Sequence, residues 1–218
     1  MQNDLLLGEP DGIIGIDEAG KGDYFGPLVV AACFSNDKID IEFEKIGLKE
    51  SENISDYRAY ILEKKIRKLS PFELVVIGPE KYNELHAKMR NLNKLLAWGH
   101  SRALENLLAK ANPREVVADQ FGDKSLIENA LMKKGRSVHL TQKHKAEAVP
   151  AVAAASVLAR AEFLRRLEKL SNQCGINLHK GAGAPVDEVG KRIFAKHGKE
   201  ELIKIAKVHF KNTKRIIT

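Results

Sequence analysis

The chain has 218 residues, of which 44% are hydrophobic and 30% are charged, a balance typical of a globular protein with one hydrophobic core. It has no apolar run near the roughly 18 residues of a membrane span, and its N-terminus does not have the basic start and apolar centre of a signal peptide. The 36 Lys and Arg residues outnumber the 29 Asp and Glu residues, and the net charge of +7 favours a polyanionic partner such as a nucleic acid. Two distant cysteines, Cys33 and Cys174, predict free thiols. We therefore expect a cytoplasmic protein with no membrane partner.

The N-terminal part of the chain begins with two apolar segments. Residues 12–17 (GIIGID) and 27–34 (PLVVAACF) predict two short buried strands joined by a glycine-rich turn. A turn-rich connection is expected over residues 35–55. The segment DYRAYILEKKIRKL then has the period of a helix, for which Asp56 is a plausible N-cap.

The rest of the chain alternates between strand and helix patterns. Three further strands are expected, at residues 72–78, 115–119 and 137–142. Further helices are expected at residues 80–90, 91–111, 125–134, 149–170, 186–197 and 199–206. This order predicts one α/β domain, spanning residues 1–218, with a helical C-terminal portion.

The glycine-rich turn GKGDYFG suggests a nucleotide-binding loop, but its spacing excludes the known patterns. The dinucleotide pattern G-x-G-x-x-G leads into a helix, whereas three residues separate Gly22 from Gly26 and Pro27 leads into a strand. The P-loop pattern requires Ser or Thr after its lysine, and Lys21 is followed by glycine. A nucleotide loop is therefore not predicted.

Acidic residues follow several of the apolar segments. Asp17 and Asp119 end two predicted strands, and the carboxyl ends of neighbouring strands are where open α/β sheets build their sites. Glu18 follows Asp17 directly, and Glu147 precedes the helix predicted at 149–170, where a negative charge is tolerated. Three or four converging carboxylates are what a two-metal phosphoryl-transfer site requires, with Mg²⁺ or Mn²⁺ as the preferred ions.

The adjacent acids pose a geometric question, because successive side chains of a strand point to opposite faces. Asp17 and Glu18 reach one site only if the chain bends there, and Gly20 and Gly22 permit such a bend. Glycines also let backbone amides approach a sugar-phosphate closely. A backbone that touches the ribose 2′-hydroxyl distinguishes RNA from DNA.

The segment GIDEAGKGDYFGPLVVAA resembles the opening motif of the type 2 ribonucleases H, which degrade RNA paired to DNA. Within that group, GKGDYFGP is more similar to ribonuclease HIII than to ribonuclease HII. Similar segments follow in order at residues 81–100, 152–160, 179–188 and 206–214. The resemblance implies the ribonuclease H fold, a five-stranded mixed sheet flanked by helices. It also implies endonucleolytic cleavage of the RNA strand of RNA/DNA hybrids, leaving 5′-phosphate and 3′-hydroxyl ends.

The resemblance also implies roles for particular residues. A two-metal mechanism with Mg²⁺ or Mn²⁺ is implied, and a monomer is expected. The implied metal-binding and catalytic residues are Asp17, Glu18, Asp119 and Glu147, the last of which is aspartate in many relatives. The implied substrate-binding residues are Gly20, Lys21 and Gly22, together with Ser51 of a DSK-like motif in which Glu52 replaces the lysine.

Two departures from the family leave questions open. Only eleven residues precede Gly12, so we expect the N-terminal substrate-binding domain of ribonuclease HIII to be missing, with partial compensation by the basic segment 204–218. Ala182 stands where ribonuclease HII has a tyrosine linked to cutting at a single ribonucleotide, so cutting at that junction stays open. Two alternatives are a hybrid-binding protein that no longer cleaves and a resolvase-like nuclease for branched DNA. The four carboxylates disfavour the first, and the GKG turn disfavours the second.

Overall fold

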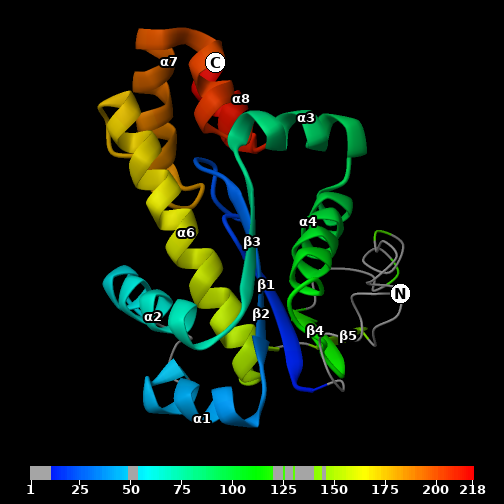
Figure 1. The fold of residues 1–218 in the computed structure, drawn as a ribbon. Helices are drawn as coiled ribbons and strands as arrows, with labels where there is room; N and C mark the ends of the chain where they lie inside the picture. Colours follow the sequence, from blue (N-terminus) through cyan, green and yellow to red (C-terminus); the bar gives the residue numbers. More distant parts are fainter. Residues whose placement is uncertain (1–10, 49–53, 120–124, 126–129, 131–139, 144–145) are drawn as a thin grey trace. The chain divides into compact units, whose positions relative to one another are not determined.

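A computed structural model describes residues 11–48, 54–119, 125, 130, 140–143 and 146–218. Its centre is a five-stranded sheet with the strand order β3-β2-β1-β4-β5 (Figure 1). The pairs β1–β4 and β4–β5 are parallel. The strands are β1 Ile13–Ala19, β2 Leu28–Ser35, β3 Phe72–Ile77, β4 Glu115–Asp119 and β5 Leu140–Lys143. The predicted five-stranded mixed sheet is confirmed.

The chain divides into two compact units, and each is described by itself. The first contains residues through Glu18, Val30–Val75 and Leu92–Ala161, and the second contains Ala19–Val29, Val76–Asn91 and Glu162–Thr218. The described helices are α1 Asp37–Lys45, α2 Asp56–Leu69, α3 Pro79–Met89, α4 Leu92–Leu107, the short 3₁₀ helix η4 Ala146–Ala148, α6 Pro150–Cys174, α7 Ala184–Ile205 and α8 Lys211–Ile217.

In the first unit, the strand β1 is packed on both faces. Ile14 and Ile16 belong to a buried cluster with Leu104 of α4, so these two side chains face α4. Gly15 faces the other way, where a Cβ atom would lie 2.2 Å from the backbone of Ala151 in α6. Helix α4 therefore covers one face of the sheet, and the first turns of α6 lie directly on the other (Figure 1). The glycine is required because any side chain would push α6 off the strand.

The structure corrects the turn-rich connection predicted over residues 35–55, because α1 lies within it. The side chain of Asn36 caps this helix by accepting a hydrogen bond of 3.2 Å from the backbone N of Ile39. Asp37 and Asp40 lie in its first turn, where acids stabilise a helix. Ser, Asn and Asp in this segment predicted turns, but here they start a helix.

Other boundaries differ by one to four residues, the largest differences being at the ends of α4 and α6. The N-cap of α2 is Ser55 and not Asp56, because the Ser55 hydroxyl accepts the backbone N–H of Arg58. The two helices predicted at 186–197 and 199–206 are both present within α7, because Gly198, with φ of 74°, breaks the helix between them. The helix predicted at 125–134 lies almost entirely outside the described residues, whereas the strand predicted at 137–142 is described from Leu140 onward, as β5.

In the second unit, Asn83 of α3 ties this helix to the segment after α7. Its Nδ2 atom donates to the carbonyls of Ile203 and Ala206, at 3.1 and 2.9 Å, and its Oδ1 atom accepts from the backbone N of Val208 at 3.1 Å. Helices α7 and α8 approach closely at Gly190, where a Cβ atom would lie 2.3 Å from Ile216. Asn83 therefore holds the segment that follows α7, and α7 packs closely against α8.

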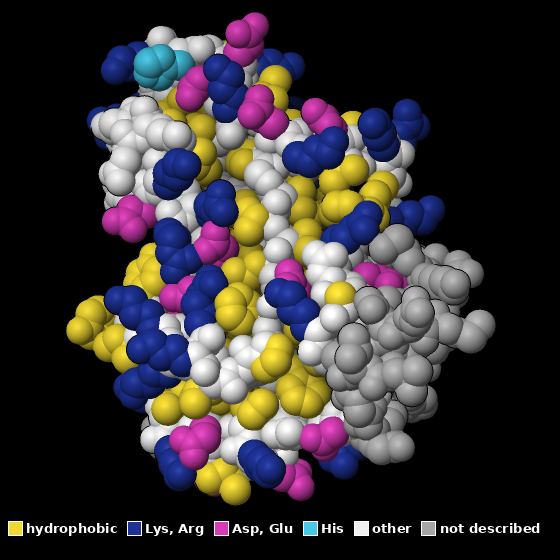
Figure 2. Space-filling view, viewed as in Figure 1, with side chains coloured by type: hydrophobic (Ala, Val, Ile, Leu, Met, Phe, Trp, Pro, Cys, Tyr) yellow, Lys and Arg dark blue, Asp and Glu magenta, His cyan; other side chains and the backbone are white. Residues whose placement is uncertain are grey.

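The outer surface of the first unit carries a basic helix. Helix α2 exposes Lys64, Lys65, Arg67 and Lys68, and Figure 2 shows Lys and Arg side chains gathered where α2 lies in Figure 1. Among the described residues, no helix has both the length and the apolar character needed to cross a membrane.

Candidate active site

Asp17 and Asp119 lie side by side on neighbouring strands. The parallel register pairs Ile16 of β1 with Ala118 of β4, so the next positions of both strands are the two aspartates. Paired strands are about 4.8 Å apart. Because side chains alternate along a strand, Asp17 points to the same face as Gly15, and Asp119 to the same face as Val117, the side of the sheet covered by α6. The structure therefore brings these two predicted site residues together.

The third acid, Glu147, is linked to Asp119 through a hydrogen bond made by the backbone of its neighbour Ala146. The backbone N of Ala146 donates to Oδ1 of Asp119 at 3.4 Å, and the Ala146 side chain is buried in a cluster with Val117 and Val152. Glu147 is the next residue of the same helix, η4. The backbone of Glu147 is thus anchored beside Asp119, while its side chain lies outside the described part of the structure.

The electrostatics of Asp17 fit a cation. Burial, and then the negative charge of Glu18, raise the pKa of the Asp17 carboxyl from 3.8 to about 7, although hydrogen bonds from Ser156 and from the backbone N of Glu18 partly offset this. The backbone hydrogen bond has a length of 2.7 Å. A divalent cation next to these carboxylates would reverse the effect, because an opposite charge favours the ionised form. The oxygen donors suit Mg²⁺ or Mn²⁺.

Glu18 points to the opposite face of the strand. Strand β1 continues regularly to Ala19, so it does not end at Asp17, and the bend expected at these two acids is absent from it. The Glu18 carboxylate instead meets His100 of α4, whose Nε2 atom lies 2.9 Å from Oε2 of Glu18. The side chain of His100 is 0% exposed and that of Glu18 is 8% exposed. The sequence carried no signal for this contact, since one histidine on an apolar helix face resembles any buried histidine.

Within the described part of the chain, no three His, Cys, Asp or Glu side chains form a group that could hold a metal ion. The described side chains thus provide the aspartate pair of β1 and β4 on one face and the Glu18–His100 contact on the other. Ser51 and Glu52 of the DSK-like motif lie outside the described residues.

The predicted substrate-binding turn belongs to the second unit. Gly20 has φ of +87°, and a Cβ atom there would lie 2.2 Å from the carbonyl O of Pro27. Lys21 and Gly22 are exposed, and the next residue, Asp23, is partly exposed. A Cβ atom at Gly22 would meet no atom within 4 Å. Gly20 therefore serves the fold of the turn, whereas the backbone at Gly22 is open to a ligand.

The basic C-terminal segment 204–218 exposes most of its cations but buries one of them. Its last helix, α8, is joined to Asp187 of α7 by Arg215, whose Nε atom lies 2.6 Å from Oδ2. Lys207 is 0% exposed, whereas Lys204, Lys211, Lys214 and Arg215 are exposed. Ala182 lies beside the same helix, and its carbonyl accepts a hydrogen bond of 2.9 Å from Nδ2 of Asn212.

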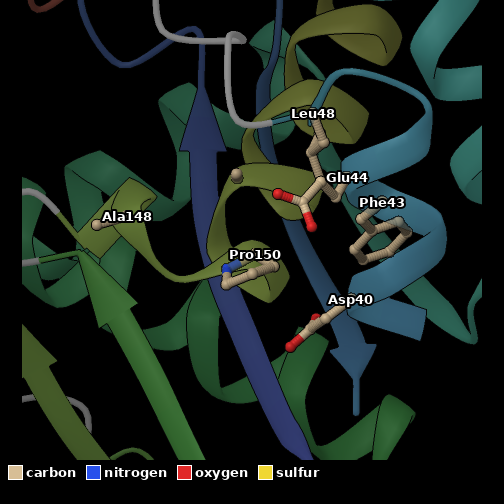
Figure 3. Close-up of a pocket in the computed structure, with 7 residues that line it drawn as sticks. Asp40, Phe43, Glu44, Leu48, Ala148 and Pro150 are labelled. Atoms are coloured by element: carbon tan, nitrogen blue, oxygen red, sulfur yellow. The ribbon is translucent and has the colours of Figure 1, made fainter. Parts of the chain in front are cut away.

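A small cavity lies in the first unit between α1 and the start of α6 (Figure 3). Its space for water is about 20 Å³, which is enough for a single molecule and far too small for a nucleotide. It is lined by Asp40, Phe43, Glu44, Leu48, Ala148, Pro150 and Ala153. We assign no substrate to it.

Sequence and structure comparisons place this chain in a known class of nuclease. The family model described as Ribonuclease HII matches residues 14–213, and the chain belongs to that family. It is therefore a ribonuclease H, an endonuclease that acts on RNA/DNA hybrids.

The similar proteins include several ribonucleases HIII. Ribonuclease HIII of Protochlamydia amoebophila (strain UWE25) is 42% identical over 204 residues, which cover 94% of this chain and 68% of that protein. Ribonuclease HIII of Chlamydia pneumoniae is 42% identical over 201 residues, covering 91% and 67%. The crystal structure of Bst-RNase HIII in complex with Mn²⁺ superposes with a TM-score of 0.88 at 34% identity, covering 94% of this chain and 69% of that one. Aquifex aeolicus RNase H3 gives a TM-score of 0.75 at 27% identity, covering 92% and 73%. The predicted ribonuclease HIII resemblance and the ribonuclease H fold are confirmed.

Proposed function

We propose that the chain cuts the RNA strand of RNA/DNA hybrids with bound Mg²⁺ or Mn²⁺ and leaves 5′-phosphate and 3′-hydroxyl ends. In this proposal, the metal-binding residues are Asp17, Glu18, Asp119 and Glu147. The Glu18 side chain leaves β1 on the side of α4, but Glu18 and His100 lie close enough to Asp17 to change the pKa of its carboxyl. The observation that carries it is the register of β1 and β4, which sets Asp17 beside Asp119 on one face of the sheet. The Mn²⁺ complex of the similar Bst-RNase HIII supports the choice of ion. We further propose that the chain acts in the cytoplasm as a monomer with a single catalytic domain.

The proposed metal-binding residues and His100 would have separate roles in this reaction. Bound cations would supply activation of the attacking water and neutralisation of charge on the phosphoryl and leaving oxygens. Asp17 and Asp119 would hold them from adjacent strands, and the Ala146–Asp119 hydrogen bond fixes the backbone that carries Glu147. His100 would keep the Glu18 carboxylate in one orientation.

Selection of RNA would fall to the glycine turn. Gly22 leaves its backbone open, and an exposed backbone can approach the 2′-hydroxyl that distinguishes RNA from DNA. We propose that Gly20, Lys21 and Gly22 bind the RNA strand, with Ser51 contributing a further hydrogen bond. Binding would depend on salt, because phosphate contacts release counterions.

The test uses two labelled duplexes, a continuous RNA/DNA hybrid and a DNA duplex with one ribonucleotide, each with Mg²⁺, Mn²⁺ or EDTA. The wild-type chain is compared with Asp119→Asn and with Glu200→Gln, a matched loss of an exposed carboxylate in α7. Calorimetric titration with Mn²⁺ measures metal binding separately from cleavage. Ligation of the products to a 3′-hydroxyl acceptor reports whether they carry 5′-phosphates.

We expect the hybrid to be cut by the wild type and by Glu200→Gln, only with a divalent ion, and not by Asp119→Asn. Loss of one metal-holding carboxylate should also weaken the binding of Mn²⁺. Binding of the hybrid without any metal-dependent cutting by the wild type would instead support the hybrid-binding alternative. Cutting of a branched DNA without ribonucleotides would support the resolvase-like alternative.

A further inference from the structure

A buried lysine lies beneath the segment that follows the glycine turn. The Nζ atom of Lys207 donates to the backbone carbonyls of Asp23 and Gly26, at 2.8 and 2.7 Å, and lies 3.5 Å from that of Phe25. The residue is 0% exposed. An ammonium group has three donors and no acceptor, so these three carbonyls match its hydrogen-bonding capacity.

The same segment is tied to the rest of the second unit at several further points. The backbone N of Tyr24 donates to the carbonyl of Gly181 at 2.9 Å, and Oδ1 of Asp23 accepts from the backbone N of Gly181 at 2.6 Å. The backbone N of Lys207 donates to the carbonyl of Tyr24 at 2.8 Å. Lys207 therefore contacts this segment through both its backbone and its side chain.

A buried cation at this position carries a desolvation cost. Burial disfavours the charged form and lowers the pKa of Lys207 to about 7. The ring of Tyr82, whose centroid is 5.7 Å from Nζ, offsets part of this cost. An apolar side chain of similar volume would avoid the desolvation cost, but it would leave carbonyls without the donor that now holds them. What the lysine provides is a fixed position for three carbonyls of one short segment.

That segment is the base of the substrate-binding turn. The tip, Gly20–Gly22, precedes it, and the backbone N of Asp23 closes the turn on the carbonyl of Gly20 at 3.4 Å. On the basis of the function proposed above, we infer that Lys207 is a positioning residue for hybrid binding. Its ammonium fixes the carbonyls of Asp23, Phe25 and Gly26 and so holds the Gly20–Gly22 turn in the conformation that receives the RNA strand. Lys207 itself touches no substrate, because it is buried.

This inference separates Lys207 from a lysine that binds phosphate. Loss of a phosphate contact reduces the slope of log K against log salt by about 1, whereas loss of a positioning contact weakens binding at every salt concentration and leaves the slope unchanged. Lys21→Ala, which removes an exposed cation from the tip of the turn, is the comparison for the first behaviour.

The experiment measures hybrid affinity at several salt concentrations, KM and kcat for hybrid cleavage, and hydrogen exchange of the amides of residues 20–26. The variants are Lys207→Met, which keeps the length of the side chain, and Lys207→Arg, which keeps its charge. Lys196→Met, an exposed lysine of α7, controls for the loss of one positive charge. If Lys207→Met does not fold, Lys207→Gln, whose amide still donates two hydrogen bonds, takes its place.

For Lys207→Met, we expect affinity for the hybrid to fall by about 10- to 100-fold, the range that misplacement of a positioning group can cost. KM should rise more than kcat falls, the salt slope should match that of the wild type, and exchange in residues 20–26 should become faster. Lys207→Arg should recover part of the affinity, and Lys196→Met should behave as the wild type.

Two results would overturn the inference while leaving the proposed function intact. In the first, the wild type cuts the hybrid, and a folded Lys207→Met variant binds the hybrid as tightly as the wild type. In the second, Lys207→Met reduces the slope of log K against log salt as much as Lys21→Ala does. A wild type that neither binds nor cuts the hybrid would overturn both proposals. In that case, unchanged hydrogen exchange of the amides of residues 20–26 in Lys207→Met would also show that Lys207 does not hold this turn.

Discussion

The Nε2 atom of His100 lies 2.9 Å from the Oε2 atom of Glu18, and this contact joins helix α4 to the second of two consecutive acids in β1. A nearly buried carboxylate with such a partner is held in one orientation. Removal of the partner in His100→Leu should therefore weaken Mn²⁺ binding, or slow hybrid cleavage, by about 10- to 100-fold, as is typical when a group that orients a metal ligand is lost.

Calorimetry with Mn²⁺ and cleavage rates check this prediction. His100→Gln should recover part of the loss, because its amide can also donate to Glu18. His197→Leu, at an exposed histidine of α7, should have no effect. If a folded His100→Leu variant had the Mn²⁺ affinity and cleavage rate of the wild type, the orientation of the Glu18 carboxylate would not depend on His100.

The raised pKa of Asp17 predicts a pH-dependent stability in the metal-free protein. Its carboxyl has a pKa of about 7 in the folded chain against 3.8 ordinarily, so the folded state binds this proton more tightly and loses stability as the pH rises from about 4 through 7. Asp17→Asn does not titrate. In EDTA at pH 8, it should exceed the wild type in free energy of unfolding, by on the order of 2 to 4 kcal/mol.

Urea denaturation at pH 4.5 and pH 8 gives the comparison. The difference between Asp17→Asn and wild type should largely vanish at the lower pH. Mn²⁺ at pH 8 should stabilise the wild type and have little effect on the variant, because binding to the folded state alone raises stability. A difference between the two proteins that is the same at both pH values would contradict the assignment.

The two glycines of the substrate turn should respond differently to alanine. Gly20→Ala introduces a Cβ atom 2.2 Å from the Pro27 carbonyl at a positive φ, so it should destabilise the protein by at least 1 kcal/mol. Gly22→Ala meets no neighbouring atom, so its thermal midpoint should stay within about 2 °C of the wild type, while its KM for the hybrid rises. Thermal unfolding and steady-state kinetics test both. An unchanged KM in Gly22→Ala would exclude a close approach of the RNA backbone at this residue.

Ala182 offers a test of substrate range. In ribonuclease HII, to which the sequence is similar, a tyrosine at the matching position is linked to cutting at a single ribonucleotide. Ala182→Tyr should therefore increase cutting of the single-ribonucleotide duplex relative to the continuous hybrid, as measured on both substrates in one mixture. Ala182→Leu adds bulk without a hydroxyl and is the control. Equal ratios for the two variants would indicate that side-chain size alone matters at this position.

Much of the sheet could be predicted because its strands are short apolar runs with clear ends. Asp119 ends β4, as predicted, since EVVAD changes from apolar to charged at that residue. The parallel register that sets Asp119 beside Asp17 could not be predicted, because pairing depends on contacts far apart in the chain. Helix α1 was missed for a local reason: Asn36 caps a helix with the same side-chain chemistry that also forms turns.

Buried polar residues were the hardest part of the site to predict. His100 and Lys207 are both 0% exposed, yet one lies in an amphipathic helix and the other in a cationic segment, where exposure is the ordinary expectation for a lysine. Their roles depend on partners more than eighty residues away in the sequence, Glu18 and the carbonyls of residues 23–26. Composition and period carry no information about such partners.

The regular course of β1 through Asp17 and Glu18 also sets what kinds of mutation this enzyme can tolerate over evolutionary time. Substitutions in Ile13–Ile16 change packing by degrees, but the insertion or deletion of one residue there would exchange the faces of the two acids. Asp17 would then turn toward α4, and Glu18 toward α6, with every other residue still present. A two-residue change would keep the faces but displace the acids along β4 by about 6.6 Å. We therefore expect natural variants of this strand to differ in side chains but to keep a constant length between Gly12 and Asp17.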